Sequence, residues 1–94
     1  MSVYVDDMRA PYGRMVMCHM IADTEDELHR MAGLIGVARR WYQGDHYDIC
    51  LAKRALAMHA GAIELTRFAL GRIVCERRRI KSTRDKETAC LPEA

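Results

Sequence analysis

Two strands are predicted at the start of the chain. Ser2–Val5 alternates polar and apolar side chains, as a short strand does, and residues 6–13 contain Pro11 and Gly13, which indicate a loop. Residues 14–22 are apolar on both faces when written as a strand. That pattern is typical of a strand inside a sheet that is covered on both sides.

The clearest helix follows these strands. Thr24 and Glu27 have the spacing of a capping box, and the acidic residues between them suit the positive end of the helix dipole. Gly36 supplies the expected C-terminal stop. The apolar face of this helix consists of four residues: Leu28, Met31, Ala32 and Ile35.

The middle of the chain predicts one more strand and a second helix. Val37–Tyr42 is predicted as an edge strand, because its two arginines interrupt the apolar alternation, and a turn is expected at 44–45. Asp48 is the expected N-cap of a helix that runs to Ala60 and is closed by a glycine.

The last third predicts a short strand over 62–65 and a third helix capped by Thr66. The order β-β-α-β-α-β-α favours a single compact α/β domain over residues 1–80, with α+β as the alternative. Residues 81–94 are mostly polar and are predicted to form a flexible tail.

Composition supports one domain and excludes a membrane span. Half of the 94 residues are apolar, which is enough for a core, yet no apolar run reaches the roughly 18 residues that cross a bilayer. The chain opens on acidic residues and its four cysteines contain no C-x-x-C pair, so we expect a cytoplasmic protein with reduced thiols. The small size leaves monomer and homodimer as alternatives.

The first functional hypothesis is an anion pocket. If Asp48 begins a helix, the free backbone N–H groups of its first turn lie beside His46, which suits a phosphate. Lys53 and Arg54 follow about one turn later, and a tyrosine is available to stack on a base. The predicted ligand is a nucleotide or another phosphorylated small molecule, held without a cofactor by Tyr4, Asp6, Arg14, His46, Tyr47, Asp48, Lys53 and Arg54.

The second hypothesis is a metal-dependent phosphoesterase or nuclease. Asp6 and Asp7 end the first strand, where only one of two adjacent carboxylates faces a given pocket. His19 lies on an apolar strand face, where a lone histidine is more often a core residue than a ligand. The candidate ligands for a divalent cation that activates water are Asp6, Asp7, His19, His46 and Asp48.

The third hypothesis is association with nucleic acid or protein through the basic third helix. The net charge of +2 is concentrated near the C-terminus, where Arg77, Arg78 and Arg79 are consecutive. The alternative for this run is a solvated helix end, where cations suit the dipole. The common nucleotide-binding, zinc-protease and serine-hydrolase motifs are absent from the sequence, so whether the protein is an enzyme stays open.

Several blocks of the sequence resemble those of a known protein family. They are, in order, VYVDDMRAPYGRM, MCHMIAD, ARRWYQ, HYDI and KRA. Over residues 2–66 these blocks resemble a family of small bacterial and phage proteins known only as a domain of unknown function. The resemblance implies one compact domain and brings no activity. Family members often carry a longer loop, with a proline, than the link between Gln43 and His46, and the basic third helix and tail look individual to this protein.

Overall fold

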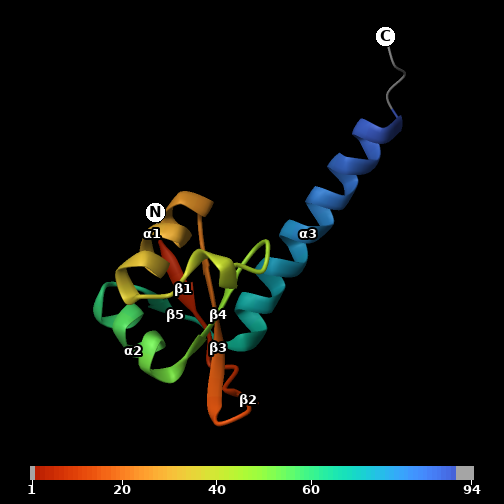
Figure 1. The fold of residues 1–94 in the computed structure, drawn as a ribbon. Helices are drawn as coiled ribbons and strands as arrows, with labels where there is room; N and C mark the ends of the chain where they lie inside the picture. The colour runs from red at the N-terminus through yellow and green to blue at the C-terminus, as the bar shows by residue number, and fades with distance from the viewer. Residues whose placement is uncertain (1, 91–94) are drawn as a thin grey trace.

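The computed structural model of the chain describes residues 2–90, and the side chains of residues 2–83. Its arrangement is drawn in Figure 1. The elements along the chain are β1 (Val3–Val5), β2 (Ala10–Tyr12), β3 (Met15–Ala22), α1 (Glu25–Ile35), the 3-10 helix η1 (Arg39–Trp41), β4 (Tyr47–Cys50), α2 (Leu51–His59), β5 (Ile63–Glu64) and α3 (Arg67–Cys90).

The sheet is organised around its longest strand, β3. β1, β2 and β4 all pair with β3 in antiparallel fashion, whereas β5 pairs with β1 in parallel. Met20 of β3 lies opposite both Val5 of β1 and Tyr47 of β4, so β1 and β4 flank β3 on its two edges. This mixed sheet with its three helices confirms the predicted α/β class.

Helices cover both faces of the sheet. Alternate residues of a strand point to opposite faces, and the neighbours Met20 and Ile21 are both fully buried. In Figure 1, α1 and α2 lie on one side of the sheet and α3 on the other. Leu70 of α3 is buried too. The core on the α1 and α2 side contains Val3, Val5, Met20, Ala22, Leu28, Ala32, Ile35, Tyr47, Ile49, Ala57 and Ala62.

The predicted first helix is confirmed at both ends. Thr24 is its N-cap, and the Thr24 hydroxyl accepts a hydrogen bond from the Glu27 backbone N–H at 3.3 Å. Gly36 is its C-cap in the left-handed conformation, with φ of 81°, which a residue with a Cβ adopts at a cost. The Val37 N–H then bonds to the Ala32 carbonyl at 2.7 Å, which satisfies the last turn.

The strand predicted over Val37–Tyr42 is wrong, because this segment contains η1. The Trp41 and Tyr42 backbone N–H groups bond to the carbonyls of Ala38 and Arg39, both at 3.0 Å. These donors are therefore satisfied locally and are not offered to a neighbouring strand. Tyr42 alone contributes to the sheet, through an isolated bridge to Tyr47.

The prediction that Asp48 caps the second helix is also wrong. Tyr47–Cys50 is the strand β4, and α2 begins only at Leu51, with Cys50 as its N-cap. Tyr47 and Ile49 are buried while Asp48 between them is half-exposed, which is the two-residue period of a strand. Pairing with β3 along four residues stabilises this conformation.

Two other segments contain more regular structure than the sequence predicted. The expected loop over 6–13 contains β2, which folds back on β3 through a turn at Gly13. Thr66 caps α3 as predicted, since its hydroxyl accepts from the Ala69 N–H at 3.1 Å. The α3 backbone continues past Ile80 to Cys90, and the last part of the predicted tail, residues 91–94, lies outside the described residues.

One further property concerns membranes. Across the part of the chain that the structure describes, no helix combines the length and the apolar character that crossing a bilayer requires. The longest helix, α3, carries arginine and lysine along its second half and extends away from the sheet (Figure 1).

Candidate metal centre

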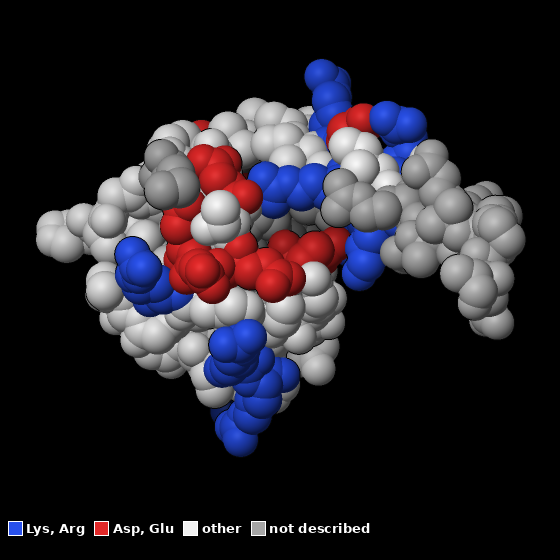
Figure 2. All heavy atoms as spheres, turned by 90° about the horizontal axis from the view of Figure 1, so that it is seen from above, with Lys and Arg blue, Asp and Glu red and all other residues white. Residues whose placement is uncertain are grey.

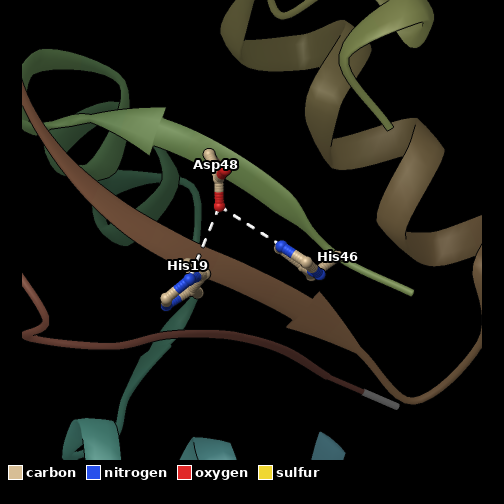
Figure 3. A group of neighbouring side chains, drawn as sticks. All are labelled: His19, His46 and Asp48. Atoms are coloured by element: carbon tan, nitrogen blue, oxygen red, sulfur yellow. Dashed lines mark ion pairs between the residues drawn. The ribbon is translucent and has the colours of Figure 1, made fainter. Parts of the chain in front are cut away.

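The register between β3 and β4 brings His19 and Asp48 together. The two residues are direct partners across the antiparallel pair, and such partners project from the same face with Cβ atoms roughly 5 Å apart. His46 precedes Asp48 by two residues and lies on the same side of the chain (Figure 3). Two imidazoles and one carboxylate therefore point toward a common point (Figure 3).

The distances within this group fit a bound metal ion. Asp48 Oδ1 lies 3.5 Å from His19 Nε2 and 3.3 Å from His46 Nε2, and the ligand atoms of the three residues all lie within 4.8 Å of one another. Two ligands bound at about 2.0–2.1 Å to a tetrahedral ion are separated by roughly 3.3 Å. All three side chains are partly exposed, so an ion has access from solvent.

In each imidazole the second ring nitrogen, Nδ1, which is not the one that approaches Asp48, contacts a further carboxylate. His19 Nδ1 lies 2.8 Å from Asp6 Oδ2, and His46 Nδ1 lies 2.6 Å from Asp45 Oδ1. A histidine that donates its Nδ1–H to a carboxylate keeps the lone pair of Nε2 for a metal. Carboxylate–histidine–metal arrangements of this kind fix the ring and increase its basicity.

Asp6 is the more firmly held of these two carboxylates. Its side chain is buried, and Oδ1 also accepts from the backbone N–H of His19 at 2.7 Å and of Met8 at 3.3 Å. The Arg54 guanidinium donates to the Asp6 carbonyl at 2.7 Å. Burial is the largest single effect and would raise the pKa of Asp6, but the hydrogen bonds from His19 and Met8, together with the charge of His19, leave the pKa below its ordinary value.

Asp45 is held by a side chain from α3. Arg78 donates from Nε to Asp45 Oδ2 at 2.6 Å and from Nη2 to Oδ1 at 3.3 Å. This two-pronged ion pair is the main reason that the pKa of Asp45 lies below its ordinary value. The Asp45 carboxylate therefore stays ionised as a partner for His46 at neutral pH.

Two of the predicted acidic and cationic candidates lie apart from this group. Asp7 accepts from the Arg67 backbone N–H at 2.7 Å and so caps α3, which is where a helix favours negative charge. Arg14 is exposed in the turn between β2 and β3. The neighbouring residues Asp6 and Asp7 therefore have different roles: Asp6 contacts His19, whereas Asp7 caps α3.

The other predicted anion-binding residues also point elsewhere. The Tyr4 hydroxyl donates to Asp23 at 3.0 Å, and the buried Tyr47 has its hydroxyl 2.7 Å from His29 Nδ1. The Lys53 ammonium lies beside Gly36 at the C-terminal end of α1, where it suits the helix dipole. Of the residues predicted to bind an anion, the structure brings together Asp6, His46 and Asp48. Arg54 joins them through its hydrogen bond to the Asp6 carbonyl.

Sequence reasoning missed Asp45 and the contact of Arg78 with it. The only local signal was an acidic residue directly before His46, in a segment that otherwise indicates a turn.

The face seen from above carries Asp and Glu side chains in a band beside Lys and Arg side chains, and the surface between them is hollowed (Figure 2). The charged surface on this side of the molecule is therefore of mixed sign.

The His19–Asp6 pair predicts a specific pH dependence for the metal-free protein. The hydrogen bond between His19 and Asp6 raises the pKa of His19 above its ordinary value of 6.5, although burial of the ring has the opposite effect. A raised histidine pKa stabilises the fold below pH 6.5, and this contribution is lost as pH rises through the folded-state pKa. Asp6 stabilises above its ordinary 3.8 and loses its contribution as pH falls through its lowered pKa. Both contributions are present together between these two ordinary values.

An NMR titration of the His19 ring with chelator present measures this effect. We expect His19 to titrate above its ordinary pKa in the natural protein and clearly lower in Asp6→Asn. Asp7→Asn removes a neighbouring charge without touching His19 and is the matched control, which should leave the His19 pKa unchanged. An unchanged His19 pKa in Asp6→Asn contradicts the pairing.

Comparisons with known proteins identify the family of this chain. Neither a search of curated proteins nor a search of solved structures finds a match to this chain. A family model matches residues 3–77, which include the three candidate ligands and both supporting carboxylates. The match also reaches beyond residue 66, where the sequence resemblance ended, into the first part of α3. The chain therefore belongs to the family described as protein of unknown function (DUF4031).

Proposed function

We propose that this domain binds a divalent transition metal ion through His19, His46 and Asp48 and uses it to hydrolyse phosphate esters. The observation that carries the proposal is the orientation of the two imidazoles. Both direct Nε2 toward one Asp48 oxygen, at 3.5 and 3.3 Å, while both Nδ1 atoms are engaged by separate carboxylates. Histidines that bind metals nearly always donate their other ring N–H to a carboxylate, a backbone carbonyl or water, and both imidazoles here have such a partner.

The ligand set favours an ion with affinity for imidazole. Two nitrogen ligands and one carboxylate suit zinc or ferrous iron, while magnesium and calcium prefer sites made of oxygen. Three protein ligands leave at least one coordination position for water, as in catalytic zinc sites. Zinc at such a site would lower the pKa of its bound water to about 7 and would supply hydroxide as the nucleophile at neutral pH.

Phosphate esters are the substrate class that the surroundings favour. Arg78 places a guanidinium close to the group, 2.6 Å from Asp45, and this cation together with the metal would attract an anionic substrate. An ion held by these residues would polarise a phosphoryl oxygen and promote loss of a proton from bound water. The resulting hydroxide would add to phosphorus as the P–O bond to the alcohol breaks and the alcohol leaves with a proton. His19, His46 and Asp48 orient the ion, and Asp6 and Asp45 orient the two imidazoles.

The two other hypotheses have less support. A nucleotide pocket without metal depended on a helix beginning at Asp48, but this residue lies in β4. The arginine run gives less support for binding nucleic acid, because its three guanidinium groups have separate surroundings. Arg77 donates to the Ala22 carbonyl, Arg78 pairs with Asp45 beside the metal group, and Arg79 pairs with Glu76 of its own helix.

The test combines metal analysis with a model substrate. Protein purified without chelator is expected to contain about one equivalent of zinc or iron, measured by elemental mass spectrometry. The loaded protein should hydrolyse bis(4-nitrophenyl) phosphate, lose this activity on dialysis against a chelator and regain it when the ion is returned. Cobalt substitution should give the visible absorption of a site with four or five ligands.

The outcomes separate the two parts of the proposal. A protein that takes up no transition metal at micromolar concentrations contradicts the site itself. A protein that binds one ion tightly but hydrolyses neither phosphodiesters nor phosphomonoesters contradicts the hydrolytic function and leaves the metal site in place. Activity that survives complete removal of metal contradicts the mechanism.

A further inference from the structure

The two carboxylates that support the metal ligands are held in different ways. Asp6 directly follows β1, is buried, and receives hydrogen bonds from two backbone N–H groups. Asp45 lies in the segment between η1 and β4, directly after Gly44, whose φ is +94°. No regular element contains Asp45, so its orientation depends on its side-chain partners.

Arg78 is the partner that orients Asp45 from outside its own segment. The two side chains form a two-pronged ion pair, with Nε to Oδ2 at 2.6 Å and Nη2 to Oδ1 at 3.3 Å. The same Oδ1 lies 2.6 Å from His46 Nδ1. A continuous set of hydrogen bonds therefore links α3, through one carboxylate, to a candidate metal ligand.

This link lies near the end of the contact between α3 and the sheet. Leu70 is buried, and Arg77 donates to the carbonyl of Ala22 at the end of β3, at 2.8 Å. After Arg78, Arg79 bonds within the helix to Glu76, and the side chains from Ile80 to Thr83 are exposed. Among the side chains that the structure describes, Arg78 is thus the last on α3 with a hydrogen bond to the rest of the domain.

We propose that Arg78 is a positioning residue for the metal ligand His46, acting through Asp45, so that the metal affinity of the domain depends on the docking of α3. The inference rests on the metal site proposed above. When α3 is docked, Asp45 is fixed and holds His46 with its Nε2 lone pair toward the ion. When this contact is broken, Asp45 and the His46 ring gain rotational freedom, and binding must restrict them again.

The expected size follows from such supporting contacts in other metal sites. Loss of a hydrogen-bonded partner of a ligand weakens metal binding by about 10–100-fold. Because the Arg78 side chain is 61% exposed, solvent competes for the pair, and we expect metal affinity to fall by about 10-fold. The ion ligands themselves remain, so binding is weakened and not abolished.

The experiment compares Arg78→Gln with Arg79→Gln. The two arginines are adjacent and exposed, and each pairs with a carboxylate, but the Arg79 partner is Glu76 of the same helix. Zinc affinity is measured by competition with a chromophoric chelator. We expect about 10-fold weaker binding in Arg78→Gln and less than about 2-fold change in Arg79→Gln. Arg78→Lys keeps the charge without the two-pronged geometry and should recover part of the loss.

A second readout separates positioning from general stability. Nitrogen-15 shifts of the His46 ring in the metal-free full chain report which ring nitrogen carries the proton. Arg78→Gln should reduce the population of the Nδ1–H form, and Asp45→Asn with Arg78→Gln should add little to either single change. Arg79→Gln should leave the ring shifts unchanged.

The outcomes are distinguishable. If the natural protein binds no zinc, the proposed metal site is wrong and the inference falls with it. If the natural protein binds zinc and Arg78→Gln binds it equally well, the site stands and the inference is overturned. Equal weakening in Arg78→Gln and Arg79→Gln also overturns it, because the effect would then come from the charge of α3 and not from Asp45.

Discussion

Replacing His46 with alanine is expected to weaken zinc binding by at least about 100-fold and to abolish the proposed hydrolytic activity. The imidazole supplies one of only three ligand atoms, at 3.3 Å from Asp48 Oδ1, and alanine cannot substitute for it. Although only 15% of the His46 side chain is exposed, it is not part of the hydrophobic core, so we expect the fold to remain at a modest cost in stability. Isothermal titration of zinc into chelator-treated protein measures the change.

His59→Ala is the matched control for this experiment. His59 is exposed in the last turn of α2 and is not part of the candidate group, so its loss should leave zinc affinity and activity unchanged. His19→Ala and Asp48→Ala should resemble His46→Ala, since each removes another ligand of the group. A His46→Ala protein that binds zinc as tightly as the natural protein would show that the ion, if bound, is held elsewhere.

Replacing Arg54 with methionine is expected to lower the free energy of unfolding by about 2 kcal/mol. The Arg54 guanidinium donates to the Asp6 carbonyl at 2.7 Å and pairs with Glu64 at 2.9 Å, and its side chain is only 11% exposed. Methionine fills the space of the aliphatic stem but leaves the Asp6 carbonyl without this donor. Because Glu64 is 55% exposed, its charge returns to solvent and adds little to the loss.

Chemical denaturation at neutral pH measures the Arg54 effect. A loss of about 2 kcal/mol reduces the folding equilibrium constant by roughly 30-fold. Arg72→Met is the matched control, because Arg72 is exposed on α3 and a change there should stay within about 0.5 kcal/mol. If Arg54→Met is as stable as this control and instead loses affinity for phosphorylated ligands, the arginine serves the anion site that the sequence suggested.

The elements with strong local signals could be predicted from the sequence. Thr24 and Gly36 mark the two ends of α1. As caps they satisfy its terminal N–H and C=O groups with hydrogen bonds that span only a few positions of the chain. Thr66 marks the start of α3 for the same reason. The strand at 37–42 was predicted from an apolar alternation that two arginines interrupt, and the prediction failed because a strand needs a partner that local sequence does not specify.

The candidate site could be predicted only in part. His19, His46, Asp48 and Asp6 were all among the proposed metal ligands, because these residue types supply the donor atoms. Their roles could not be assigned, since Asp6 supports a histidine while Asp7 next to it caps a helix. Asp45 was read as a turn residue because Arg78, which fixes its position, lies 33 positions away.

The sequence by itself determined the α/β class, the limits of α1, the start of α3 and the membership of the DUF4031 family. Only the tertiary structure decided that Tyr47–Cys50 is a strand, and with it the site. Four residues with a two-residue period are too short to distinguish a strand from the start of a helix. Pairing with β3 decides between them, and its register brings Asp48 opposite His19. The site therefore depends on hydrogen bonds between distant segments, which local sequence does not encode.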